Sequence, residues 1–182
     1  LLDMGGMAST VDRELSGFVG AAARGDERAF AHIVAAYHED MRRVCAFMAQ
    51  DAALADDAVQ QAWAIAWRKL GSLRDPARLR PWLVSIAANE TRKLLKKRGR
   101  RAQVEVVVDE FHDTPIGSAD GVDVIDLRVA MGRLDPDDRA LLAMRYGAGF
   151  NATELSAAVG ISPSGIRNRL ERLLARLRQE LE

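Results

Sequence analysis

The chain has 182 residues, of which 48% are hydrophobic and 5% aromatic, and its 26 basic and 26 acidic side chains give a formal net charge of +0. A neutral average excludes a uniformly basic nucleic-acid binder, and no apolar run approaches the roughly 18 residues that cross a bilayer. The abundance of Ala, Leu, Arg and Glu favours helices over sheets. We therefore expect an all-α protein without membrane insertion. Because the first residues lack the basic-then-apolar order of a secretory signal, we expect it in the cytoplasm.

Amphipathic segments are predicted in the first hundred residues. Residues 26–48 carry apolar side chains at intervals of three or four, and residues 54–70 repeat the pattern up to a stop at Gly71. The segment GSLRDPARLRP is then a loop, and Pro81 suits the first turn of a third helix. These helices are expected to form an N-terminal bundle.

Charge is segregated along the chain. From Arg92 to Arg101 there are seven cations and no acid, whereas from Ala102 to Asp126 there are seven acids and no Lys or Arg. Blocks of one sign indicate solvated or interaction segments, and Pro115 with the two glycines of the acidic block predicts a flexible linker. A short strand over VEVVVDEF is the weaker alternative, because it would have no pairing partner.

Helix signals resume after the linker. Asp135 is the expected N-cap of a helix with Pro136 at its first position, and Asn151 with Glu154 resembles a capping box. The chain is thus expected to hold two small helical domains joined by a flexible acidic linker. The predicted division is 1–25 as a partly disordered N-terminal segment, 26–100 as a helical bundle, 101–126 as the acidic linker and 127–182 as a second helical domain.

The segment ELSAAVGISPSGIRNRLERL has the layout of a helix-turn-helix, with a short helix, a turn at Gly160 and a second helix that Ser162 caps. With Ile166 and Leu170 facing inward, the polar side chains stay outside, and the first turns of this helix can enter a DNA major groove. The candidate DNA-contacting residues are Ser162, Ser164, Arg167, Asn168, Arg169, Glu171 and Arg172. The alternative is a solvated amphipathic helix.

A second basic region precedes the linker. The basic loop GSLRDPARLRP, stiffened by two prolines, lies beside a helix that carries an asparagine and several cations, and this pair could hold an unstacked base. Its candidate residues are Arg74, Arg78, Arg80, Asn89, Arg92, Lys93, Lys96 and Lys97. A solvated charged face is the alternative. Trp63, Trp67 and Trp82 could stack on bases, but their helical spacing favours core packing.

An exposed polar patch is predicted on the helix over residues 54–70, which carries Trp63 and Trp67. It consists of Asp56, Asp57, Gln60 and Gln61. Consecutive helical carboxylates diverge by about 100° and do not converge on one reacting atom, so a protein-contact surface is favoured over catalysis, and we expect no enzyme. Cys45 is the single cysteine, in an apolar setting that predicts a buried core residue, and no metal or cofactor is indicated.

In this order the segments resemble the extracytoplasmic-function sigma factors of bacterial RNA polymerase, the smallest members of the sigma-70 family. The resemblance covers residues 26–181. DDAVQQAWAIAWRKL and PWLVSIAANETRKLLKKR are similar to region two of the family, and LDPDDRALLAMRYGAGFNATELSAAVGISPSGIRNRLERLLARL is similar to region four. Gly165 stands where the family usually has threonine. The segment FNATEL stands where the family usually begins the first helix of its helix-turn-helix with leucine, serine and tyrosine.

The resemblance implies a sigma factor that binds core RNA polymerase and directs promoter-specific initiation. The polar patch would contact the clamp helices of the largest subunit, and the flap region of the polymerase would be a further contact. The basic loop and its helix would recognise and help to melt the promoter −10 element, and the last helix would read the −35 element. The acidic linker would thread toward the active-site and RNA-exit channels, and an anti-sigma factor would cover these surfaces.

The alternative function is a dimeric helix-turn-helix regulator that acts without being a polymerase subunit. It predicts a stable dimer and tight binding to DNA alone, because a dimer engages two half-sites. The sigma interpretation instead predicts a monomer that binds promoter DNA weakly until it joins core polymerase.

Overall fold

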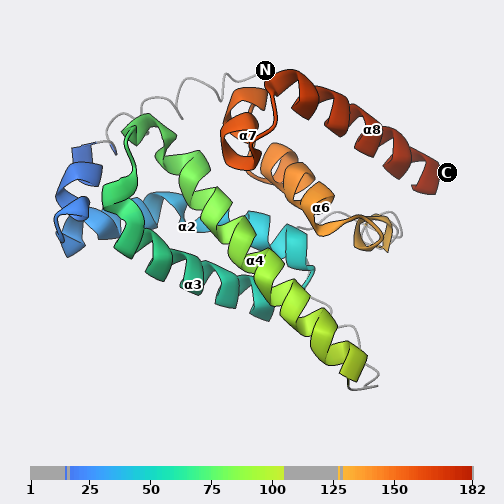
Figure 1. Ribbon diagram of the computed structural model, residues 1–182, viewed down its shortest axis with the longest axis horizontal. Coiled ribbons are helices and arrows are strands. Elements are labelled where there is room, and N and C mark those ends of the chain that lie inside the picture. The colour runs from blue at the N-terminus through green and yellow to red at the C-terminus, as the bar shows by residue number, and fades with distance from the viewer. Residues whose placement is uncertain (1–14, 16, 105–126, 128, 182) are drawn as a thin grey trace.

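The protein is described by a computed structural model over residues 15, 17–104, 127 and 129–181, and within these ranges it is helical without a strand. The expected all-α class is confirmed. The first half is built from α2 (Glu27–Ala49), α3 (Ala52–Lys69) and α4 (Leu79–Val104), and the second from α6 (Pro136–Leu142), α7 (Ala152–Val159) and α8 (Pro163–Leu181) (Figure 1).

Helix α2 begins at a side-chain cap and ends at a residue with left-handed backbone geometry. The Asp26 carboxylate accepts hydrogen bonds from the backbone N–H groups of Arg28 and Ala29 at 2.9 and 3.0 Å. The helix ends at Gln50, which has a left-handed φ of 54°. Ile33 and Met41 belong to a fully buried stripe on the inner face, which confirms the amphipathic pattern read from the sequence.

Alanines fill the centre of the bundle where α3 meets its neighbours. The buried face of α3 carries Ala58, Ala62 and Ala66, so the helices can approach closely, and α3 contacts both α2 and α4. The prediction that the tryptophans pack in the core is only partly right. Trp63 packs half-buried against the core, whereas Trp67 lies at the rim and is 36% exposed.

Helix α4 is longer than expected. It continues past Gly99 to Val104, where the sequence pattern indicated the start of an irregular linker. One glycine costs a helix only about 1 kcal/mol, and the surrounding Lys, Arg, Gln and Ala residues are good helix formers. The rest of the acidic segment, with most of VEVVVDEF, lies outside the described residues.

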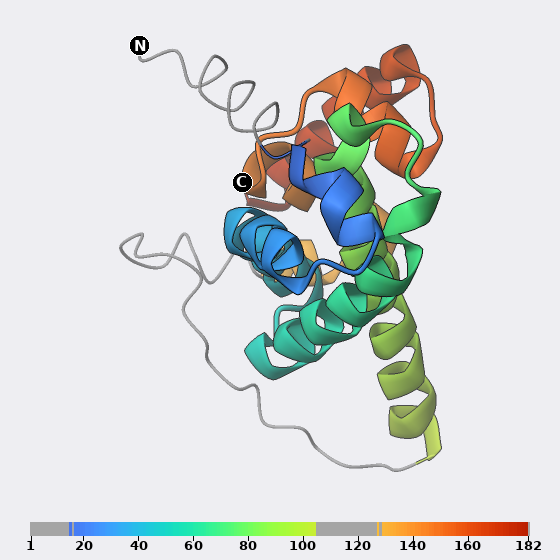
Figure 2. The same cartoon turned by 90° about the vertical axis from the view of Figure 1, so that its left-hand side faces the viewer.

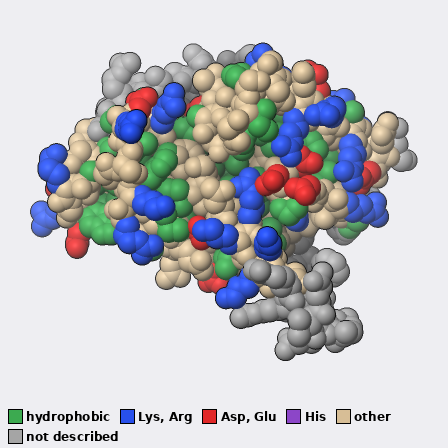
Figure 3. Space-filling view, viewed as in Figure 1, with side chains coloured by type: hydrophobic (Ala, Val, Ile, Leu, Met, Phe, Trp, Pro, Cys, Tyr) green, Lys and Arg blue, Asp and Glu red, His purple; other side chains and the backbone are tan. Residues whose placement is uncertain are grey.

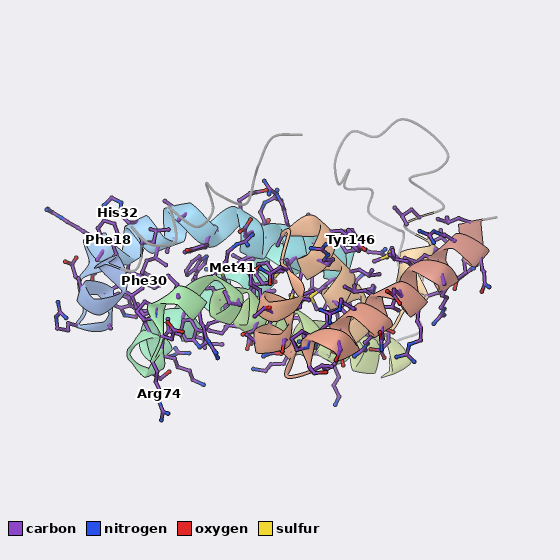
Figure 4. All side chains as sticks on the ribbon, turned by 90° about the horizontal axis from the view of Figure 1, so that it is seen from above. Phe18, Phe30, His32, Met41, Arg74 and Tyr146 are labelled. Carbon is purple, nitrogen blue, oxygen red and sulfur yellow. The ribbon has the colours of Figure 1, made fainter. Side chains whose placement is uncertain are left out.

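Part of the N-terminal segment also belongs to the fold. Residues 17–23 are helical, and Leu15, Val19 and Ala22 are buried in the core. The Phe18 and His32 rings stack with centroids 4.6 Å apart (Figure 4). The folded bundle thus extends into the segment 1–25, which was expected to be partly disordered.

The predicted caps of the second half are all present. Asp135 accepts from the Asp137 N–H at 2.8 Å with Pro136 in the first turn of α6, and Asn151 and Glu154 form a complete capping box at the start of α7. Between these helices lies the π-helical turn η3 (Ala143–Gly147), which the sequence pattern did not predict.

The two halves share one continuous hydrophobic core. Helix α2 contacts both α6 and η3, and α4 contacts α7, so that the second half lies against the first (Figures 1 and 2). Leu141, Met144 and Phe150 of the second half are at most 2% exposed. Among the residues that the structure describes, no helix combines the length and the apolar character needed to cross a bilayer.

Candidate nucleic-acid interface

Helix α8 separates an apolar inner face from a polar outer face. Ile166 and Leu170 belong to its buried stripe, and its start is capped by Ser162, whose hydroxyl accepts from the Gly165 N–H at 3.2 Å. The Ser164 hydroxyl lies 3.2 Å from that of Ser162. The exposed side chains of the first turns are Ser164, Arg167, Asn168, Glu171 and Arg172, the arrangement expected of a helix that reads a groove.

Arg169 departs from this outer face. Its guanidinium reaches α6, where Nη2 lies 2.6 Å and Nε 2.7 Å from Oδ1 of Asp138. This ion pair ties α8 to α6 and leaves Arg169 half-buried, and its contact with DNA stays a prediction. The helical period leaves this residue between the inner and outer faces, so sequence spacing alone could not place it.

There is little room for a side chain at Gly165, near the start of α8. A Cβ atom at Gly165 would lie 2.8 Å from Cγ2 of Ile161 and 3.2 Å from the Ser162 hydroxyl. A side chain at this position would push against the turn between α7 and α8. A threonine here, as the family usually has, would therefore require the Ile161 side chain to shift.

The basic loop between α3 and α4 contains two short 3₁₀ turns, η1 (Leu70–Ser72) and η2 (Pro76–Arg78). Asp75 caps η2 by accepting from the Ala77 N–H at 3.1 Å, and Arg78 lies 3.6 Å from the same carboxylate. Arg74 is exposed and points away from the body of the protein (Figure 4).

One face of α4 brings together four of the predicted residues. Asn89, Arg92, Lys93 and Lys96 follow the three- and four-residue helical interval, and Lys97 is exposed beside them. Arg92 Nη1 donates to the side-chain amide oxygen Oδ1 of Asn89 at 2.7 Å.

A buried acid supports this face. Lys93 Nζ lies 2.6 Å from the carboxylate of Glu90, whose side chain is 9% exposed. Sequence reasoning missed Glu90, although an acid three residues before a lysine is the usual signal for such a pair.

Arg80 lies apart from the rest of the predicted set. Its side chain is 16% exposed, with Nε 2.8 Å from Asp40 and Nη1 3.7 Å from Glu154. It also donates to the Ala148 carbonyl and lies over the Phe150 ring, 4.5 Å from the centroid. In this conformation Arg80 joins the two halves and is not available to a ligand.

A cleft of about 300 Å³ opens where α4 faces the second half. Its polar lining comes from Asn89, Arg92, Asp137 and Arg169, and Arg92 pairs with the Asp137 carboxylate. Lys and Arg side chains are scattered over this side of the molecule, and a group of acids lies among them (Figure 3). The cleft therefore combines basic side chains with acids that already neutralise them.

The predicted polymerase-contacting patch is exposed as expected. Asp56, Asp57, Gln60 and Gln61 lie on the outer side of α3, in two pairs four residues apart. Cys45 is fully buried, as predicted, and burial raises the pKa of its thiol from 9.0 to about 11. Among the described residues, no group of three His, Cys, Asp or Glu side chains is placed to hold a metal ion.

Two family models match the chain. Sigma-70 region 2 matches residues 33–101, and Sigma-70, region 4 matches residues 130–179. The "RNA polymerase sigma factor CarQ" of Myxococcus xanthus is 30% identical over 86% of this chain and 91% of its own length. The "Probable RNA polymerase sigma factor RfaY" of Xanthomonas campestris is 28% identical over 96% of this chain, which spans only 46% of that relative.

Solved structures agree with these matches. CnrH, in complex with the cytosolic domain of CnrY, superposes with a TM-score of 0.68 at 26% identity, covering 94% of this chain and 97% of CnrH. The sigma factor RpoE of Bartonella quintana, in complex with the anti-sigma factor NepR, gives 0.70 at 25% identity, with coverages of 84% and 96%.

The fold and the two matching regions thus define a transcription initiation factor of two helical regions, and sigma factors are a non-catalytic class of such factors. The chain belongs to the sigma-70 family of RNA polymerase sigma factors, and its relatives include the "ECF RNA polymerase sigma factor SigM" of Mycobacterium tuberculosis. Sigma-factor relatives along nearly the whole chain disfavour the alternative of a dimeric regulator that works without polymerase.

Proposed function

We propose that this chain joins core RNA polymerase in the cytoplasm and directs it to promoters through three separate surfaces, without being an enzyme itself. The observation that carries this proposal is that region 2 and region 4 occur in one chain, each with an exposed polar helix face. The functional units would be residues 26–100 and 127–182, and 101–126 would connect them.

The first surface would read the −35 element. Helix α8 would enter the major groove with Arg167 and Asn168 near base edges, because arginine pairs with guanine and asparagine with adenine. Ser162 and Ser164 at the helix start suit phosphate, and Glu171 would accept from cytosine. Arg169 would contribute indirectly, by holding α8 in position through its ion pair with Asp138.

The second surface would bind the −10 element. The exposed Arg74 and Arg78 of the loop and the α4 face with Asn89 and Lys93 would hold the melted strand, whose backbone attracts cations. Arg80 and Arg92 are proposed members of the same surface that would have to leave their present partners first.

The third surface would contact the polymerase. Asp57 and Gln61 on α3 would bind the clamp helices of the largest subunit, since exposed acids and amides on a rigid helix suit a polar protein interface. Because its structural neighbours CnrH and RpoE occur in complexes, RpoE with an anti-sigma factor, we also propose an anti-sigma partner for this chain.

Run-off transcription with purified core polymerase over a promoter library tests the proposal. We expect transcripts that depend on the added chain and that share a −10 and a −35 sequence upstream of their start sites. A chain that fails to co-purify with core polymerase, or that leaves start-site selection unchanged, contradicts it. A stable dimer that binds its DNA tightly without polymerase would favour the regulator instead.

A further inference from the structure

Lys93 differs from the neighbouring lysines of α4 in having a buried acidic partner. Its Nζ lies 2.6 Å from the Glu90 carboxylate, and the side chain of Glu90 is 9% exposed whereas that of Lys93 is 69% exposed. Among the described residues, no acid pairs with the exposed Lys96 or Lys97. The α4 face therefore presents two kinds of lysine, one whose charge a buried acid compensates and two that keep their full charge.

Glu90 depends on this partner. It lies on the buried side of α4, one turn after the fully buried Ala87. A carboxylate removed from water is stable only when a cation or hydrogen-bond donors compensate its charge. The Lys93 ammonium supplies that compensation, and the short contact is close to the length of a charge-assisted hydrogen bond. Glu90 therefore holds the Lys93 amine in place on the surface of α4.

A lysine in such a pair is poorly suited to phosphate but keeps hydrogen-bond donors. A cation that binds phosphate does so through its net charge, and it releases a counterion from the DNA. The pair of Lys93 and Glu90 has no net charge, so it gains little from a phosphate. An ammonium group has further N–H donors beyond the one that a single carboxylate accepts. These donors suit the neutral acceptors of a base, and guanine offers O6 and N7 side by side.

Asn89, one turn before Lys93 on the same face, favours the same kind of base. Its amide oxygen already accepts from Arg92, so its side chain also has only donors left to offer. Adenine presents a donor together with an acceptor, and asparagine reads it with both of its amide groups. A base edge made of acceptors therefore fits Asn89 and Lys93 better than adenine does.

We propose that Lys93 reads a base of the −10 strand, with guanine preferred, and does not bind a phosphate, and that Glu90 is its positioning residue. The inference rests on the proposed function of the α4 face. Lys96 and Lys97, which keep their full charge, then act on the phosphates of the strand without regard to its sequence.

The substitutions Glu90→Gln and Lys93→Met together remove the pair without changing the net charge. Glutamine and methionine are close in length to the side chains that they replace, and both are good helix formers. The matched control is Lys97→Met, which removes an exposed cation of the same helix. Glu90→Gln alone removes only the acid and leaves Lys93 with its full charge.

The first measurement is run-off transcription by core polymerase with each variant, over a promoter library with a randomised −10 segment. We expect the wild type to favour guanine over adenine at one position, and the double variant to lose about fivefold or more of that preference, as for one base contact. Lys97→Met should weaken all sequences equally. Because a preference is a ratio between sequences within one variant, it does not depend on how much of the variant folds.

The second measurement is the salt dependence of holoenzyme binding to a labelled promoter from that library, followed by fluorescence anisotropy. Lys97→Met should reduce the slope of log affinity against log salt by about 0.7, the value for one phosphate of a single strand. The double variant should keep the wild-type slope. Glu90→Gln alone should steepen the slope by a similar amount and bind all sequences more tightly, because Lys93 then acts on phosphate.

A double variant that keeps the guanine preference overturns the proposal, as does one whose slope falls like that of Lys97→Met. An unchanged slope in Glu90→Gln also contradicts it, because the acid would then have no influence on Lys93. Run-off transcription by the wild type separates the two levels. If the wild type selects promoters without a preference that depends on the pair, only the role of Lys93 and Glu90 is wrong. If it selects none, the proposed function fails and this role with it.

Discussion

Arg169 of α8 and Asp138 of α6 form an ion pair, with the guanidinium Nη2 2.6 Å from the carboxylate Oδ1. Asp137, the next residue on α6, pairs with Arg92 of α4. The first turn of α6 thus contacts both helices that carry proposed DNA-reading residues. An acid-rich helix start suits this place, because the positive end of the helix dipole stabilises the carboxylates.

Substitution of Arg169 or Asp138 should affect DNA binding only indirectly, by changing the position of α8. We expect Arg169→Ala and Asp138→Ala each to lower the free energy of unfolding by about 1 kcal/mol, since the pair is partly exposed. Each should also weaken binding to a −35 duplex by roughly threefold, and the double variant should be no worse than either single one. Urea denaturation and duplex titration check this. Tighter duplex binding by Asp138→Ala, as simple charge removal would give, contradicts it.

Arg167→Ala should impair −35-dependent transcription and leave polymerase association intact. The side chain is exposed on the outer face of α8, and loss of a base contact costs about 1–3 kcal/mol, or roughly 5- to 150-fold in promoter affinity. Run-off assays on promoters with and without a −35 element measure the effect. Arg178→Ala, an exposed arginine of the last turn, is the control and should behave like wild type.

The reciprocal variant is Asp57→Ala with Gln61→Ala on α3. It should reduce co-purification with core polymerase and leave duplex binding by the isolated chain unchanged. Loss of polymerase association in the Arg167 variant, or loss of DNA binding in the α3 variant, would show that the two surfaces are wrongly assigned.

Alanine should have opposite effects at two helical glycines. At Gly99 a Cβ would meet nothing within 4 Å, so Gly99→Ala should stabilise the protein by up to about 1 kcal/mol. At Gly165 the Cβ would lie 2.8 Å from Ile161, so Gly165→Ala should destabilise it by about 1 kcal/mol or more. Chemical denaturation of both variants decides the matter, and an equal gain at both sites would disprove the steric account.

The buried thiol of Cys45 should make stability depend on alkaline pH. Its pKa is raised from 9.0 to about 11, so the folded state holds the proton more tightly than the unfolded state. This contribution is fully present below pH 9 and is lost as the pH rises through 11, amounting to at most about 3 kcal/mol. Denaturation curves of wild type and Cys45→Ala between pH 8 and 11 isolate it. Parallel pH profiles for the two proteins would rule it out.

Much of the local structure could be predicted because its causes are local. The caps Asp135, Asn151 and Ser162 lie within three residues of the N–H groups that they satisfy, so sequence spacing reveals them. The outer face of α8 likewise follows from the helical period of its leucines. The end of α4 cannot be found in this way, because no apolar stripe continues past Gly99 although the helix runs on to Val104.

The partners of the arginines depend on contacts between distant parts of the chain. Composition, helical period and capping determined an all-α protein with a helix-turn-helix and an exposed polar patch on α3, because each signal acts over one or two turns. Only the tertiary structure decided that Arg80 and Arg92 face acids of the second half and that Arg169 anchors its own helix. A cation in a sequence shows which partners it can take, but the packing of the core determines which of them it meets.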